Sequence, residues 1–172
     1  LIYKNKFNWD FFKRGSMKFL IFLLFVPVLN AQECPDLTGK YSCTSEDSMN
    51  RKQEYSLEIQ QSNVGDHIQY TTVSNGITNV ILTDAKTRVE VVAKDLAYFR
   101  LSRSASCANN KLIIDRKQEA SKSRNFDFVF LEELETSYYE KDNGSIKGDI
   151  TGIVKFAYRK SPYSIKEVCV PN

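Results

Sequence analysis

The sequence predicts an all-β fold, an antiparallel up-and-down β-barrel of about 8–10 strands, with a two-sheet β-sandwich as the alternative. Three observations predict it. Apolar and polar residues alternate over short segments, turn-forming residues recur at intervals of about 8 to 14 residues, and no segment of ten residues keeps helical spacing. Residues 115–123 are the best candidate for one short helix, but their polarity suits a solvated loop equally well.

The expected strands follow one another along the chain with short polar links between them. In residues 55–60 every second residue is apolar, which places Tyr55, Leu57 and Ile59 on one buried face. The later candidates are residues 68–73, 77–82, 88–92, 98–101, 111–116, 126–130, 134–140, 145–158 and 165–170. Asn143-Gly144 is the clearest turn, because both residues tolerate the positive φ angles of a tight hairpin.

Residues 1–31 differ from the rest in charge and hydropathy. They hold five basic residues and one acid, so that 19 basic and 20 acidic residues remain in 32–172. A binding site for nucleic acid depends on a clustered excess of Lys and Arg. We therefore expect no nucleic-acid partner.

An export signal is expected at residues 17–31. Met17-Lys18 opens an apolar run of 11 residues, from Phe19 to Leu29, with a small residue at Ala31 where cleavage would follow. The run is shorter than the roughly 20 residues that span a bilayer. We expect residues 1–16 to be non-native upstream translation and 32–172 to be a single β-barrel domain. The mature protein is then periplasmic or secreted and does not span a membrane.

Four cysteines follow the expected cleavage site, and two disulfides are their default state in an oxidising compartment. They are Cys34, Cys43, Cys107 and Cys169. Three pairings are open. If the last strand closes the barrel antiparallel to the first, the geometry favours Cys34 with Cys169 and Cys43 with Cys107. The spacing contains no CxxC and the only histidine, His67, follows a turn signal, so no metal site is expected.

No catalytic motif is present, and we expect a non-enzymatic protein without a cofactor. The chain contains no GxSxG, HExxH, phosphate-binding loop or GxGxxG. The three acids of residues 131–135 fall between two strand candidates and are expected in a solvated turn. The basic residues around 117–124 and 155–166 are expected on exposed strand faces and loop tips.

Aromatic residues at alternating strand positions are the candidates for a ligand-binding interior. A barrel of about eight strands is either filled by side chains or wide enough for one small ligand. The candidate lining residues are Tyr55, Tyr70, Phe126, Phe128, Phe130, Phe156 and Tyr158. Plain core packing is the competing interpretation of each.

The segment Leu37-Thr38-Gly39-Lys40-Tyr41-Ser42-Cys43 resembles the opening strand of lipocalin-like barrels. In those proteins a glycine followed two residues later by an aromatic closes one end of the barrel. Gly39 and Tyr41 match, with tyrosine in place of the more usual tryptophan. The resemblance implies an extracytoplasmic carrier for a small apolar or amphipathic molecule and assigns no binding residue.

Two functions follow as hypotheses. The first is an exported, lipocalin-like binding protein for a small, partly apolar ligand. The second is an extracytoplasmic interaction module, such as an enzyme inhibitor, which contacts an unidentified protein through loops at 44–52 and 116–124.

Overall fold

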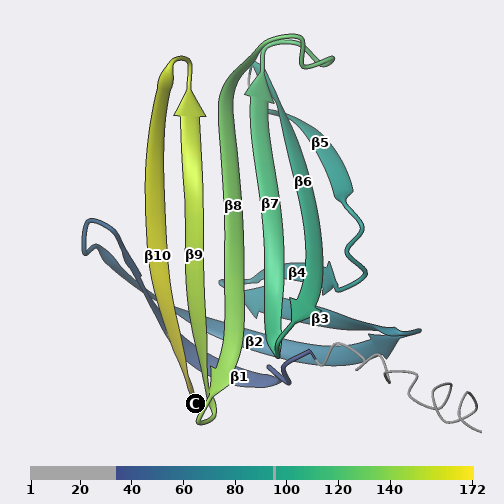
Figure 1. Ribbon diagram of the computed structural model, residues 1–172, viewed down its shortest axis with the longest axis vertical. Coiled ribbons are helices and arrows are strands. Elements are labelled where there is room, and N and C mark those ends of the chain that lie inside the picture. The colour runs from purple at the N-terminus through teal and green to yellow at the C-terminus, as the bar shows by residue number, and fades with distance from the viewer. Residues whose placement is uncertain (1–33, 95) are drawn as a thin grey trace, which may run out of the picture. The chain divides into compact units, whose positions relative to one another are not determined.

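Ten β-strands form one antiparallel sheet in the computed structural model, which describes residues 34–94 and 96–172 (Figure 1). The expected upstream segment 1–16 and signal peptide 17–31 lie outside the described residues. The strands are β1 (Gly39–Asp47), β2 (Lys52–Val64), β3 (His67–Ser74), β4 (Ile77–Leu82), β5 (Arg88–Lys94), β6 (Ala97–Ala108), β7 (Lys111–Ser121), β8 (Val129–Asp142), β9 (Ser145–Phe156) and β10 (Arg159–Pro171).

The strand order is β4-β3-β2-β1-β10-β9-β8-β7-β6-β5. Within β1 to β4 and within β5 to β10 each strand pairs with its neighbour along the chain, and β10 returns to pair antiparallel with β1 in the middle of the sheet. The prediction of an all-β, antiparallel up-and-down fold is confirmed, and the sheet is one half-barrel rather than the two sheets of a sandwich. No helix occurs in residues 34–94 and 96–172, so this part of the chain holds none that could cross a membrane.

The strands β4 and β5 follow each other in sequence but form the two edges of the sheet. The segment between them, residues 83–87, is held by two backbone hydrogen bonds. Thr83 N–H donates to the Ile68 carbonyl, and Ala85 N–H donates to the Ala105 carbonyl. These bonds tie the connection to β3 and β6. The edge strands β4 and β5 are not paired with each other, so the half-barrel is open along them.

Tight turns join most of the other strands. Asn75-Gly76 and Asn143-Gly144 have positive φ at both residues, as the predicted hairpins require. Asn109 and Asn110 do the same between β6 and β7. Residues with short polar side chains adopt this conformation at low cost, which explains why these links are so short.

The strands β7 and β8 are longer than the sequence predicts. Arg116–Ser121 continues β7, so the expected helix or loop at 115–123 is wrong, and so is most of the interaction loop at 116–124. The acids of residues 131–135 lie within β8 and not in a turn. Glu119 of β7 pairs with Arg100 at 2.7 Å, and Glu132 pairs with Lys155 at 2.7 Å. In the sequence alone, charged residues that pair across strands cannot be told from charged residues of a solvated loop.

Two disulfides join the four cysteines, as predicted: Cys34–Cys107 and Cys43–Cys169. The favoured pairing of Cys34 with Cys169 and of Cys43 with Cys107 is wrong. The last strand does lie antiparallel to the first, but the register places Cys43 opposite Cys169. Cys34 precedes β1 and reaches across to β6. The two disulfides are consistent with an oxidising extracellular compartment.

The core lies on one face of the sheet, near the disulfides. Its fully or nearly buried residues are Leu37, Tyr41, Cys43, Ile59, Tyr70, Ala105, Cys107, Leu112, Ile146 and Cys169. The segment before β1 covers this face. Its Pro35 carbonyl accepts a hydrogen bond of 2.6 Å from the Tyr70 hydroxyl, and its Leu37 carbonyl accepts one of 3.1 Å from Tyr41.

Candidate functional site

A cavity of about 280 Å³ lies on the core face of the sheet. This volume is just below the roughly 300 Å³ at which typical small-molecule pockets begin, so the cavity suits a compact occupant. Most of its wall is apolar or aromatic, and three lining residues carry an aliphatic hydroxyl or a carboxyl group, namely Thr72, Ser74 and Glu167. It is lined by Leu37, Tyr55, Leu57, Ile59, Tyr70, Thr72, Ser74, Ile81, Leu112, Ile114, Tyr139, Ile146 and Glu167.

Glu167 of β10 is the one acid in this wall, and it is 7 % exposed. The alternation of β10 directs Ile165, Glu167 and Cys169 to the same face, so a carboxyl group enters an otherwise apolar region. Burial raises the pKa of Glu167 above its ordinary value, and a hydrogen bond with Tyr55 opposes only part of this effect. The neutral form of this acid is therefore more favoured than in an exposed glutamate.

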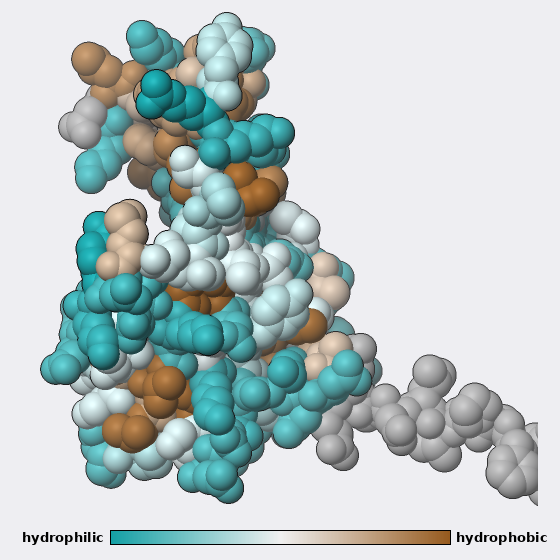
Figure 2. Space-filling view, turned by 60° about the vertical axis from the view of Figure 1, so that its left-hand side comes forward, coloured by the Kyte–Doolittle hydropathy of each residue, from teal (hydrophilic) through white to brown (hydrophobic). Residues whose placement is uncertain are grey.

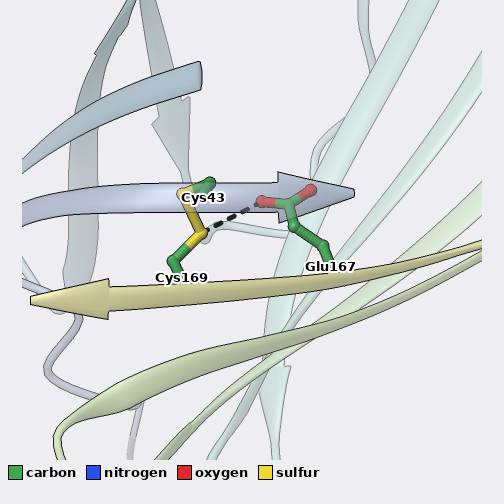
Figure 3. Close-up of side chains that lie close together, drawn as sticks. All are labelled: Cys43, Glu167 and Cys169. Carbon is green, nitrogen blue, oxygen red and sulfur yellow. Dashed lines mark hydrogen bonds between the residues drawn. A yellow bond between two sulfur atoms is a disulfide. The ribbon is translucent and has the colours of Figure 1, made fainter. Parts of the chain in front are cut away.

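The carboxyl group of Glu167 lies beside the Cys43–Cys169 disulfide (Figure 3). Its Oε1 is 3.4 Å from the Sγ atom of Cys169. A disulfide sulfur carries no proton, so this contact is a hydrogen bond only when the neutral carboxyl group donates. The three side chains lie close enough to suggest a metal cluster. Both sulfurs are bonded to each other, however, and offer no thiolate to a metal ion.

Two tyrosines flank Glu167 in the cavity wall. Tyr55 of β2 bonds to the carboxyl group, and burial raises the pKa of its hydroxyl. Tyr139 of β8 lies over Gly148 of β9, where an added Cβ would come within 2.8 Å of the tyrosine ring and 3.1 Å of Glu167 Cβ. The missing side chain at Gly148 therefore makes room for both. Burial also raises the pKa of Tyr139, so both tyrosines stay neutral.

A second polar cluster lies further along the same face. The Tyr163 hydroxyl is 2.7 Å from a carboxylate oxygen of Glu133 and 2.7 Å from one of Glu135. Arg116 pairs with Glu135 at 2.9 Å. One hydroxyl proton serves only one of the two acids at a time, and the Arg116 Nε is buried without a hydrogen-bond partner in the described part of the chain. This cluster borders the cavity but does not line it.

A larger hollow of about 680 Å³ extends over β6 to β9. Hydroxyl and charged side chains make up most of its lining, among them Ser102, Asp115, Lys117 and Thr136. Three cations line it, Arg103, Arg116 and Lys117. Lys117 is already paired with Glu119 at 3.0 Å and with Glu132 at 3.3 Å, and Arg116 with Glu135 at 2.9 Å. We regard the smaller cavity as the better candidate site, because it combines an apolar wall with a buried polar group that lacks a counter-charge.

The structure brings only part of the predicted aromatic set to the cavity. Tyr55 and Tyr70 line it. The expectation that Phe128, Phe156 and Tyr158 point inward is wrong, since their side chains are 68 %, 56 % and 103 % exposed. Figure 2 shows apolar groups among hydrophilic ones at the end of the sheet where β8 begins and β9 ends.

The remaining two predicted residues lie near that same end. Phe130 is half-buried in β8. Phe126 is half-buried in the loop 122–128, where its ring packs 4.4 Å from the guanidinium group of Arg100. The expected strand at 126–130 is wrong up to residue 128, and Phe126 and Phe128 therefore belong to a loop. His67 is exposed at the start of β3, as the sequence predicts.

The sequence reasoning missed Glu167 and Tyr139. A signal for both exists in the alternation. Glu167 is two residues from Cys169, which must face inward to form a disulfide. Because residues two apart in a strand lie on the same face, Glu167 also faces inward. Tyr139 is the second residue after Ser137, which is also buried on the core face of β8.

No protein-family model matches the chain, and no curated protein matches it.

Proposed function

We propose that the protein is an exported, non-catalytic binding protein that holds one small, partly apolar molecule in the cavity of the half-barrel. The observation that carries this proposal is the cavity of about 280 Å³, whose apolar wall contains the polar groups of Tyr55 and Glu167. Ligand pockets characteristically combine a hydrophobic lining with a few polar groups that fix the orientation of the ligand. The lipocalin-like opening strand supports the same function by resemblance.

The covering segment supports this proposal. Cys34 is fixed to β6 by its disulfide, and Pro35 and Leu37 are buried against the core. Leu37 of this segment forms part of the cavity wall together with residues of the strands, so a bound molecule would contact the segment as well as the sheet. The disulfides hold this arrangement without a large core, as in other small extracellular domains.

Native mass spectrometry of the protein purified from its own host tests the proposal. The wild type is expected to carry one small molecule. The variant Thr72→Phe fills the cavity from its wall and is expected to carry none. Val73→Phe is the matched control, because Val73 is the next residue of β3 and faces the other side of the sheet. The proposal fails if wild type and Thr72→Phe both have the mass of the bare polypeptide.

A second candidate function is the extracytoplasmic interaction module, and β5 favours it. All seven residues of this edge strand are exposed, including Val89, Val91 and Val92. An edge strand presents unpaired backbone groups that another polypeptide can extend. A stoichiometric protein partner that Val91→Pro loses and Thr72→Phe retains would favour this function over ligand binding.

A further inference from the structure

Glu167 is a buried acid without a counter-charge. Glu119, Glu132 and Glu135 each form an ion pair with a lysine or arginine. Glu167 forms no ion pair with any of the described residues. No lysine, arginine or histidine lines the cavity. An ionised carboxylate in such a place is unfavourable unless a cation accompanies it. Buried acids that stability alone does not require are candidates for a functional site.

The groups around Glu167 are suited to one kind of cation. The aromatic rings of Tyr55 and Tyr139 line the same wall, and the face of an aromatic ring attracts an ammonium group. The rest of the wall consists largely of aliphatic side chains, including those of Leu57 and Ile114. An anionic ligand would instead meet the one acid of the wall and no basic group.

We propose that the cavity binds a compact aliphatic amine, whose ammonium group pairs with Glu167 between Tyr55 and Tyr139 while its hydrocarbon chain lies against the aliphatic wall. This inference rests on the proposed binding function and adds the chemical class of the ligand. Where Glu167 is protonated in the free protein, binding also releases a proton to solvent, because the acid becomes the carboxylate partner of the ammonium group.

The surroundings of Glu167 allow this proton release to be attributed to it. The titratable groups that face it are the hydroxyls of Tyr55 and Tyr139. The neighbouring strands β1 and β9 place uncharged residues opposite it, Ser45 and Gly148. The charges of Arg116 and Glu135 act on Tyr139, and they pair with each other at 2.9 Å.

Isothermal titration calorimetry with pentylamine, pentan-1-ol and pentanoate tests the inference on the oxidised protein at pH 7. Pentylamine is expected to bind about tenfold or more tightly than pentan-1-ol, and pentanoate most weakly. Titrations of pentylamine at several pH values, in buffers of different ionisation enthalpy, are expected to show net proton release wherever the free Glu167 is protonated. Glu167→Gln is expected to lower the affinity for pentylamine to that for pentan-1-ol and to abolish the proton release. Glu133→Gln is the matched control on the same face and is expected to change neither.

The outcomes separate the ligand class from the binding function. If pentan-1-ol binds but pentylamine has no advantage in the wild type, or if the advantage survives in Glu167→Gln, the amine inference is overturned and the binding function stands. If no probe binds and the protein from its host carries no small molecule, the binding function itself fails. The comparison of probes on the wild type does not depend on whether Glu167→Gln folds.

Discussion

The ring of Tyr163 lies where the side chain of residue 152 would be, and residue 152 is a glycine. A Cβ added to Gly152 would come within 2.6 Å of the Tyr163 Cε1 and hydroxyl oxygen. The ring thereby crosses from β10 over β9 and places its hydroxyl 2.7 Å from Glu135 on β8. Glycine in a strand is unfavourable by itself, and an aromatic ring that covers it from a neighbouring strand restores packing.

We predict that Gly152→Ala lowers the free energy of unfolding by about 1–3 kcal/mol, the usual cost of an added methyl group in a filled space. Urea unfolding of the variant measures this change. In a Tyr163→Ala background the same substitution is expected to cost much less, because the ring that it overlaps is absent. Equal costs in both backgrounds would contradict the packing argument.

The buried acid predicts an unusual dependence of stability on pH. The folded-state pKa of Glu167 is raised, so the folded protein holds a proton that the unfolded chain releases above about pH 4.5. The contribution of Glu167 to the free energy of unfolding is fully present below that pH and is lost as the pH rises through the folded-state pKa. The total loss is about 1.4 kcal/mol for each unit by which the folded-state pKa exceeds the unfolded one.

Glu167→Gln removes this titration. We predict that the variant is more stable than the wild type at pH 7 and that the difference shrinks toward pH 4, as measured by urea unfolding at several pH values. Glu133→Gln, outside the cavity, serves as the control. A difference between Glu167→Gln and wild type that stays constant from pH 4 to 7 would show that the acid does not titrate with an altered pKa.

Alternation along the sequence predicts the strands where one face is apolar, and it fails where both faces are polar. The strand at 77–82 is predicted with both its bounds correct, because the apolar residues Ile77, Val80 and Ile81 contrast with the polar turn residues before and after them. The second half of β7 and the first part of β8 are missed because Lys117, Glu119 and Glu132 have the polarity of solvated residues. Their stabilising partners lie on other strands, and a single sequence does not show which residues are opposite.

The candidate site was predicted in part for the same reason. Tyr55 and Tyr70 are recognisable as inward residues of apolar faces. Glu167 is not recognisable in this way, because an acid in a strand is assigned to the solvent side unless it is known which alternate residues of that strand face inward. The disulfide pairing depends on the register of β1 against β10, which places Cys43 and not Cys34 beside Cys169. Alternation predicts which face a residue lies on, but not its partner across the strands.

The two disulfides are expected to differ in their effect on binding. They close loops with sequence separations of 73 and 126 residues, and the chain-entropy estimate gives each about 4–5 kcal/mol of stability. Only the Cys34–Cys107 bond holds the segment that covers the cavity. We predict that Cys34→Ala/Cys107→Ala weakens the binding of pentylamine more than Cys43→Ala/Cys169→Ala does, once both folded fractions are corrected for by urea titration. The prediction is wrong if the order is reversed.

A chain of ion pairs runs across the strands from Arg100 through Glu119, Lys117 and Glu132 to Lys155. It gives a prediction about stability alone. Arg100 pairs with the buried Glu119 at 2.7 Å and packs against Phe126. Arg100→Met leaves Glu119 with Lys117 as its remaining cation, and we predict a loss of about 1–3 kcal/mol. The exposed Arg124 provides the control, since Arg124→Met is expected to change stability by less than about 0.5 kcal/mol. Pentylamine binding should be unaffected by either substitution, because neither these ion-paired residues nor Arg124 line the cavity.

The hydroxyl of Tyr70 fixes the cover of the cavity through a single hydrogen bond. Tyr70 is fully buried, and its hydroxyl donates to the Pro35 carbonyl at 2.6 Å. Tyr70→Phe leaves that buried carbonyl without this donor, so we predict a loss of about 1–2 kcal/mol in unfolding free energy. We also predict faster amide hydrogen exchange at Leu37, in the segment that the bond holds. Tyr138→Phe, on the opposite face of the sheet, is the control and should leave that exchange rate unchanged. Unaltered exchange in Tyr70→Phe would mean that the Cys34–Cys107 disulfide, the Tyr41 hydrogen bond to the Leu37 carbonyl and the burial of Leu37 hold the segment without the Tyr70 hydroxyl.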